Sequence, residues 1–117
     1  MTSNKSSTRY FSKIQENHVA NVINGRTTPN SGATPYIKGD VVSKGTGDNS
    51  WLLECKTSMA NKQSFSIKKD WLRILRQDAI QQGKLNYALV FNFGPNTENY
   101  YVLSEAKFKE LFDESNS

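Results

Sequence analysis

Three charged residues have the types and the spacing of a hydrolytic metal site. Asp40 opens the short run DVVS, and Glu54 and Lys56 stand two positions apart in the strand-like stretch WLLECK. Alternate side chains of a strand share a face, so Glu54 and Lys56 are expected to project together. Pairing of residues 40–43 with 51–56 across the intervening turn would bring the Asp40 and Glu54 carboxylates close together.

Crowded carboxylates of this kind indicate a bound cation. Two carboxylates that approach closely raise one another's pKa unless a positive charge lies between them. Magnesium takes oxygen ligands, typically one or two carboxylates together with phosphate and water. An ammonium beside it, here from Lys56, can steady a metal-bound water or the charge that builds on a phosphate. The set therefore predicts metal-assisted phosphodiester hydrolysis. The alternative, a weakly stabilising surface ion pair at a strand end, is a common origin of an E-x-K tripeptide.

A sheet with helices on its faces is expected to position these residues. Strands are expected at 40–43, 51–56, 87–93 and 99–103, and helices from about Ser7 to Gly25, from Ser66 to Gly83 and after Ser104. The strand–helix–strand unit favours a parallel pair, and the hairpin before it favours antiparallel pairing. The predicted fold class is α/β, more closely α+β, with a central mixed sheet of about five strands flanked by helices.

Apolar periodicity predicts which faces of the helices are buried. In the first helix the stripe is Phe11, Ile14, His18 and Val22, widened by Val19 and Ile23, with Gly25 as the stop. In the second helix Ser66 is the expected N-cap residue. Its stripe is Ile67, Trp71, Ile74, Leu75 and Ala79.

Length and composition limit the class of protein. A chain of 117 residues with 36% apolar content suits one domain, residues 1–117, with disorder expected at 1–6 and 114–117. No run resembles a transmembrane segment or a signal peptide, so a cytoplasmic protein is expected. The single cysteine excludes an internal disulfide and a multi-cysteine zinc site. A net charge of +4 is compatible with a polyanionic partner.

The order of several short motifs resembles that of a known superfamily. The motifs are Glu16 in the first helix, then Ser31-Gly32-Ala33, Gly39-Asp40-Val41, Glu54-Cys55-Lys56, SFSIKKDWLRILRQDA and YALVFNFG. Over roughly residues 8–103 the chain resembles the PD-(D/E)XK nucleases, and among them the archaeal and phage-type Holliday junction resolvases. One departure is Gly39, which replaces the usual proline before the metal-binding aspartate.

The resemblance implies a restriction-endonuclease-like core and a set of site residues. Asp40 and Glu54 would bind Mg²⁺, or Mn²⁺ in its place, with a backbone carbonyl near Cys55 as a further ligand. Lys56 would orient or activate the attacking water. Glu16 would complete the acidic cluster and metal site, and Ser31 would contact substrate phosphate or the metal site. The family cuts four-way junctions by paired nicks as a homodimer, leaving a 5′-phosphate and a 3′-hydroxyl.

Basic residues supply candidate DNA contacts. Lys68 and Lys69 are expected in the first turn of the second helix, where the helix dipole favours an anion such as phosphate. Arg9 and Lys13 are spaced by four and would share a helical face, and Arg26 follows that helix. Each of these side chains would equally fit a solvated surface.

Two other functions remain open. One is a related nuclease that acts on flaps, single strands or duplex DNA, and the other is a non-catalytic DNA-binding protein with the same fold. The expected dimer surface combines the run 87–93, the pair Tyr100-Tyr101 and the last helix. The small size and the resemblance favour a phage or mobile-element source, with action in the host cytoplasm.

Overall fold

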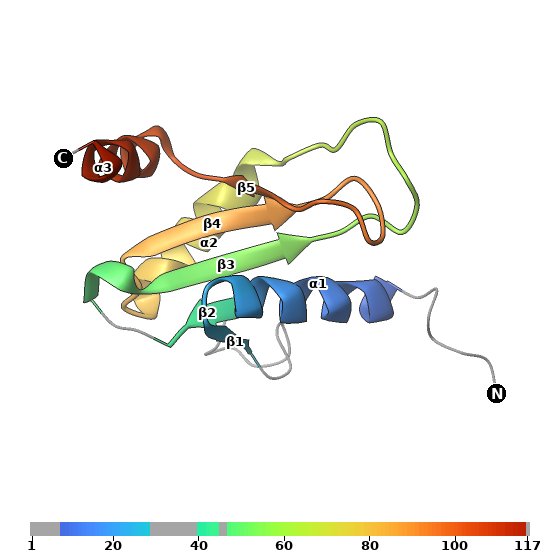
Figure 1. Cartoon of the computed structure of the whole chain (residues 1–117), viewed down its shortest axis with the longest axis horizontal. Helices are drawn as coiled ribbons and strands as arrows, with labels where there is room; N and C mark the ends of the chain where they lie inside the picture. The colour runs from blue at the N-terminus through green and yellow to red at the C-terminus, as the bar shows by residue number, and fades with distance from the viewer. Residues whose placement is uncertain (1–7, 29–39, 45–46, 117) are drawn as a thin grey trace.

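Five strands form one mixed sheet in the computed structural model, which describes residues 8–28, 40–44 and 47–116 (Figure 1). The strands are β1 (Gly25–Thr27), β2 (Val41–Ser43), β3 (Trp51–Lys56), β4 (Asn86–Phe91) and β5 (Tyr100–Val102), and they lie side by side in this order. The helices are α1 (Thr8–Val22), α2 (Lys69–Gln81) and α3 (Glu105–Ser115), and Gly47–Asn49 forms the 3₁₀ turn η2. The predicted α+β class with a mixed five-stranded sheet is confirmed.

Strand pairing also follows the prediction. β3 and β4 are parallel and are joined through α2, whereas β1–β2, β2–β3 and β4–β5 are antiparallel. A parallel pair needs a crossover connection, and the helix supplies it. The carboxyl ends of β3 and β4 and the amino end of β2 therefore meet at one edge of the molecule.

Two apolar layers cover the two faces of the sheet, with α1 and α2 on opposite sides (Figure 1). On the α1 face, Val19 and Ala20 pack against buried strand residues Val41, Leu53, Ala88 and Val90. On the α2 face, Leu75 and Ala79 pack against Val42, Leu52 and Leu89. Both faces of β3 and β4 are thus buried, as their nearly continuous apolar runs require.

The buried face of α1 differs from the predicted stripe. Val19 and Ile23 pack against the sheet as predicted, but Ile14, His18 and Val22 are exposed, and Gln15 and Ala20 are buried instead. Small and β-branched side chains let the helix approach the sheet closely. The polar Gln15 is tolerated there because its amide donates to the Lys56 carbonyl.

Three predicted element ends are also wrong. Asn24, with a φ of 53°, takes the left-handed position after α1, and Gly25 opens β1, where a Cβ would collide with the Val42 carbonyl. Lys68, not Ser66, is the N-cap residue of α2, because the backbone is still extended at Lys68. The C-terminal segment 114–117, expected to be disordered, is helical as far as Ser115.

The last helix stands apart from both layers. Its expected N-cap is present, since Ser104 Oγ accepts the Lys107 N–H at 3.1 Å. None of its residues is buried, and Phe108 and Phe112 stack on each other while remaining exposed. In Figure 1 it lies beyond the amino ends of β3 and β4. None of the helices in the described ranges combines the length and apolarity that a membrane span requires.

Candidate functional site

Asp40 lies beside the end of β3. The β2–β3 register pairs Val41 with Leu53 and Val42 with Leu52. The Asp40 N–H continues that ladder by donating to the Leu53 carbonyl at 3.0 Å. Its carboxylate Oδ2 then accepts the Cys55 N–H at 2.8 Å. The hairpin thus places the Asp40 carboxylate against the middle of Glu54-Cys55-Lys56, as the sequence predicts.

Glu54 and Lys56 leave β3 by the same face, toward α2. Lys56 Nζ lies 3.3 Å from Glu54 Oε2, and the two side chains are 30% and 28% exposed. The same Nζ lies 4.5 Å from the ring centroid of Trp71, a cation–π distance. A cleft of about 190 Å³ is formed here by Glu54, Lys56, Trp71, Ile74, Leu75 and Asp78.

Glu16 reaches the site from α1. It stands three and four residues before Val19 and Ala20, so it belongs to the helical face that packs on the sheet. Burial raises the pKa of its carboxyl from 4.5 to about 7; Asp40 and Glu54 contribute to the increase, and Lys13 opposes it. The carboxyl therefore lies within electrostatic range of both other acids, although α1 covers the face opposite α2.

The Glu54 carboxyl is perturbed in the same direction. Burial raises its pKa first, the Asp40 charge raises it further, and Lys56 offsets part of the increase. The thiol of Cys55 also has a raised pKa, from burial and from the Asp40 charge, so it stays protonated at neutral pH. Cys55 is therefore unsuited to act as a nucleophile. The net result is a half-buried site with an excess of negative charge.

A polar network that the sequence did not predict fixes this end of β3. Gln15 is buried, and its Nε2 donates to the Lys56 carbonyl at 2.8 Å and to Asn99 Oδ1 at 3.1 Å. Asn92 Nδ2 donates to the same Asn99 oxygen at 3.2 Å, and Thr57 Oγ1 donates to Asn92 Oδ1 at 2.9 Å. The network joins α1, the ends of β3 and β4, and the segment before β5. The available signal was Gln15 standing four residues before Val19, on the face that becomes buried.

A wider cleft of about 560 Å³ opens over this network. Its described lining comes from α1, from Thr57 and Asn92, and from the β4–β5 connection, and it includes His18, Glu98 and Tyr101. Neither lysine nor arginine is among the described residues that line it. The cleft is therefore less suited to phosphate than the smaller one that holds Lys56.

The candidate DNA contacts occupy both faces of the sheet. Arg9 and Lys13 are exposed on α1, and Arg26 is exposed in the edge strand β1. Lys68 and Lys69 are exposed at the start of α2, with Lys68 Nζ 5.8 Å from the Trp71 ring centroid. Ser31 lies outside the described residues.

Comparisons of the chain with protein-family models, with curated proteins and with solved structures found no match in any of the three. The resemblance to PD-(D/E)XK nucleases and the site roles that it implies therefore stay predictions.

Proposed function

We propose that this protein is a Mg²⁺-dependent endonuclease that resolves four-way DNA junctions by paired nicks. The observation that carries the proposal is the position of the Asp40 carboxylate, against Glu54-Cys55-Lys56 at the end of β3. The Glu16 carboxyl adds to it within electrostatic range. Burial and the nearby Asp40 charge raise the pKa of Glu16 and of Glu54. Keeping such carboxylates ionised in a half-buried site costs folding free energy, and a bound cation offsets that cost.

The chemical type of the available ligands, carboxylate oxygen, suits magnesium. Carboxylate oxygens are the hard ligands that Mg²⁺ prefers, and one or two of them are the usual number from the protein. The described residues contain no group of three or more acidic, histidine or cysteine side chains close enough to hold an ion. Asp40 and Glu54 are therefore assigned as the direct metal ligands. Glu16 is assigned as a nearby carboxyl that would act on the metal through water. When bound, Mg²⁺ or Mn²⁺ would stabilise the charge that develops on the phosphate.

The other groups have roles that follow from their positions. Lys56 Nζ, beside Glu54 and over Trp71, can orient the attacking water and stabilise charge on the phosphate. Gln15 holds the Lys56 main chain in place. Water attack on phosphorus breaks the bond to the 3′ oxygen, which leaves a 5′-phosphate and a 3′-hydroxyl.

Binding of the substrate would use both faces of the molecule. Lys68 and Lys69 would contact phosphates near α2, and Arg9, Lys13 and Arg26 would contact them near α1 and β1. Ser31 is kept as a candidate phosphate contact. Paired nicks need two active sites, so the proposed working form is a homodimer. The proposed place of action is the cytoplasm. The strand β4 lies between β3 and β5 and is mostly buried, and Tyr100 packs against the Phe91 and Phe93 rings. Of the expected dimer surface, this leaves Tyr101 and the exposed side of α3 as the candidates.

A second candidate is a non-catalytic DNA-binding protein. The Glu54–Lys56 ion pair favours it, because that pair partly neutralises the acidic site without a metal. The related nuclease alternative, acting on flaps, single strands or duplex DNA, uses the same site residues.

One assay separates the three functions. End-labelled four-way junction, flap, single strand and duplex are incubated with the protein, with Mg²⁺ and with EDTA in parallel. Symmetric nicks in the junction alone, dependent on Mg²⁺, are the expected result. Cutting of another substrate selects the related nuclease. Binding without cutting, in Mg²⁺ and in Mn²⁺, selects the non-catalytic role.

A further inference from the structure

Five aromatic side chains form a connected row beside the candidate site. Phe65 stacks on Phe91 with ring centroids 4.9 Å apart and an interplanar angle of 24°. Phe65 also lies 6.3 Å from Trp71, and Phe91 lies 5.4 Å from Phe93 and 5.7 Å from Tyr100. These five residues are referred to below as the aromatic row. Because the rings support one another, the row is preformed.

Strand register ties the aromatic row to the site. Phe91 is the β4 partner of Lys56 in the parallel β3–β4 ladder, and Tyr100 is the β5 partner of Phe91. Partnered residues in neighbouring strands project from the same face, roughly 5 Å apart. The row therefore begins one strand away from Lys56 and continues across the sheet on the α2 face.

The aromatic row remains accessible in the monomer. Tyr100 is 45% exposed, and the other four rings are half-buried. The buried contacts of α2, through Leu75 and Ala79, cover the earlier part of β3 and β4, and the first turn of α2 contributes Trp71 to the row. The sheet face at the carboxyl ends is thus lined by rings, one of which comes from α2.

Lysines border the aromatic row. Lys56 Nζ and Lys68 Nζ lie 4.5 Å and 5.8 Å from the Trp71 ring centroid. Lys62 is exposed and is held next to the row by its N–H, which donates to the Phe93 carbonyl at 2.7 Å. Rings flanked by cations are the elements from which proteins build sites for unpaired nucleic acid strands.

Charge decides between the two occupants that such a surface could take. A second copy of this chain, docked about a two-fold axis, would set the lysine border against itself, and lysine is depleted from protein interfaces. A nucleic acid strand instead supplies planar bases for the rings and phosphates for the lysines. The surface therefore favours a nucleotide.

We propose that the aromatic row is a stacking site for unpaired bases next to the phosphate that Lys56 contacts. The inference rests on the proposed function and narrows its substrate class. Bases inside a continuous duplex are stacked on their neighbours and cannot reach the rings. The site therefore selects DNA that exposes unpaired bases at or beside the scissile bond, as a branch point does when the base pairs next to it open.

Binding tests the proposal without any cleavage. The protein is used as Asp40→Asn, and the DNA carries 2-aminopurine at an unpaired position beside a branch point. A fully paired duplex with the same fluorophore is the comparison. Stacking on a ring quenches 2-aminopurine, so we expect quenching with the branched DNA and none with the duplex. Quenching by both DNAs to the same extent, or by neither, would overturn the proposal.

Ring-specific variants complete the test. Phe65→Leu and Tyr100→Leu keep apolar volume but remove the ring, and each should weaken binding of the branched DNA roughly tenfold and reduce the quenching. Phe11→Leu removes a ring from α1, which covers the opposite face of the sheet, and should leave the quenching unchanged. Equal binding by the Phe65, Tyr100 and Phe11 variants contradicts the proposal. Because the readout needs no cutting, an inactive protein that still shows the quenching refutes the nuclease proposal alone.

Sedimentation of the same variants addresses the competing occupant. If the aromatic row joins two copies of the chain, Tyr100→Leu will shift the protein toward monomer in the absence of DNA, and the stacking proposal fails. The proposal predicts an oligomeric state that is the same in Tyr100→Leu and in the parent protein.

Discussion

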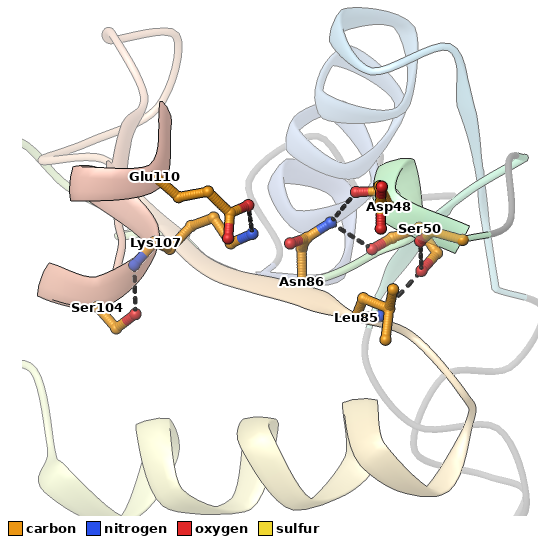
Figure 2. A network of polar contacts seen from close by, with 8 residues as sticks. Asp48, Ser50, Leu85, Asn86, Ser104, Lys107 and Glu110 are labelled. Atoms are coloured by element: carbon orange, nitrogen blue, oxygen red, sulfur yellow. Dashed lines mark hydrogen bonds and ion pairs between the residues drawn. The ribbon is translucent and has the colours of Figure 1, made fainter. Parts of the chain in front are cut away.

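The two ends of β3 and β4 carry polar groups of opposite character. At the amino ends, Asn86 Nδ2 donates to the carbonyls of Asp48 and Ser50 at 2.7 and 2.9 Å (Figure 2). Ser50 Oγ donates to the Gly47 carbonyl at 2.7 Å and accepts the Leu85 N–H at 2.9 Å. These contacts are neutral and mostly involve backbone groups. They close the connection into β4 and leave only Asn86 Oδ1 without a hydrogen bond in this described network.

At the carboxyl ends, three acidic side chains share one region. Burial and the Asp40 charge raise the pKa of Glu16 and of Glu54; Lys13 offsets part of the increase at Glu16, and Lys56 offsets part of it at Glu54. Neutral amides satisfied by backbone contribute to folding. Crowded carboxylates oppose folding in the absence of a cation. Under the proposed function, the amino end has a structural role and the carboxyl end holds the metal site.

The largest effect is expected from the carboxyl end. Asp40→Asn keeps the shape of the side chain and removes its charge. Junction cutting in Mg²⁺ should fall more than about 100-fold, because loss of a direct metal ligand should cost more than loss of a residue that only hydrogen-bonds to a ligand. DNA binding should persist, because a negative charge near phosphate is removed. Single-turnover cleavage and a binding titration measure the two quantities. Asp48→Asn, an exposed aspartate in η2 at the opposite end of β3, is the matched control and should cut normally.

Lys56→Met should have the next largest effect on the reaction. Methionine keeps much of the apolar stem over Trp71 but removes the ammonium, and cutting should slow by about 100-fold, as for loss of one stabilising group. The rate is measured with saturating junction and Mg²⁺. If the variant cuts at the normal rate, Lys56 takes no part in the reaction, and its assigned role is wrong.

The amino end should respond in stability instead of activity. Asn86→Ala removes two donated hydrogen bonds from a residue that is 2% exposed, and should lower the free energy of unfolding by about 2 kcal/mol. Urea unfolding measures this change. Cutting per folded molecule should be unchanged. A variant that stays folded but no longer cuts would contradict a purely structural role for the amino end.

The smallest effect is a pH dependence at Glu16, measured without divalent metal. Its pKa is raised from 4.5 to about 7, so the folded protein retains a proton that the unfolded chain has released. Stability therefore falls as pH rises from 4.5 to 7, and the loss is complete above pH 7. Glu16→Gln should be more stable than the parent protein at pH 8 by about 1 kcal/mol, a figure reduced for solvent screening.

The parent protein and Glu16→Gln should unfold alike below pH 4.5, where Glu16 is protonated in both states. Thermal unfolding at both pH values tests the sign. A stability difference that grows as pH falls would contradict the assigned shift.

The strong strands could be predicted from sequence because their signals are local. WLLECK forms β3 over the same six residues, and its alternation correctly separates Leu53 from Glu54 and Lys56. The sequence does not predict β1, because a strand of three residues is too short to show an alternation of apolar and polar side chains.

The remaining differences come from tertiary contacts. Gln15 faces the sheet because the Lys56 carbonyl, 41 residues away, accepts its amide proton. In the aromatic row, Phe65 stacks on Phe91, and strand register places Phe91 beside Tyr100. No spacing along the sequence predicts these contacts. For the site, the sequence predicted the proximity of Asp40 and Glu54-Cys55-Lys56, because one hairpin sets it. The environment that raises the Glu16 pKa depends on how α1 packs.

Metal binding tests the contrast between the two ends most directly. Free Mn²⁺ is followed by electron paramagnetic resonance while it is titrated into the parent protein, Asp40→Asn and Asn86→Ala, without DNA and at neutral pH. The account predicts that the parent protein and Asn86→Ala bind Mn²⁺ alike and that Asp40→Asn loses this binding. Equal Mn²⁺ binding by Asp40→Asn, or no binding by the parent protein, would contradict the assignment of the carboxyl end as a metal-dependent site.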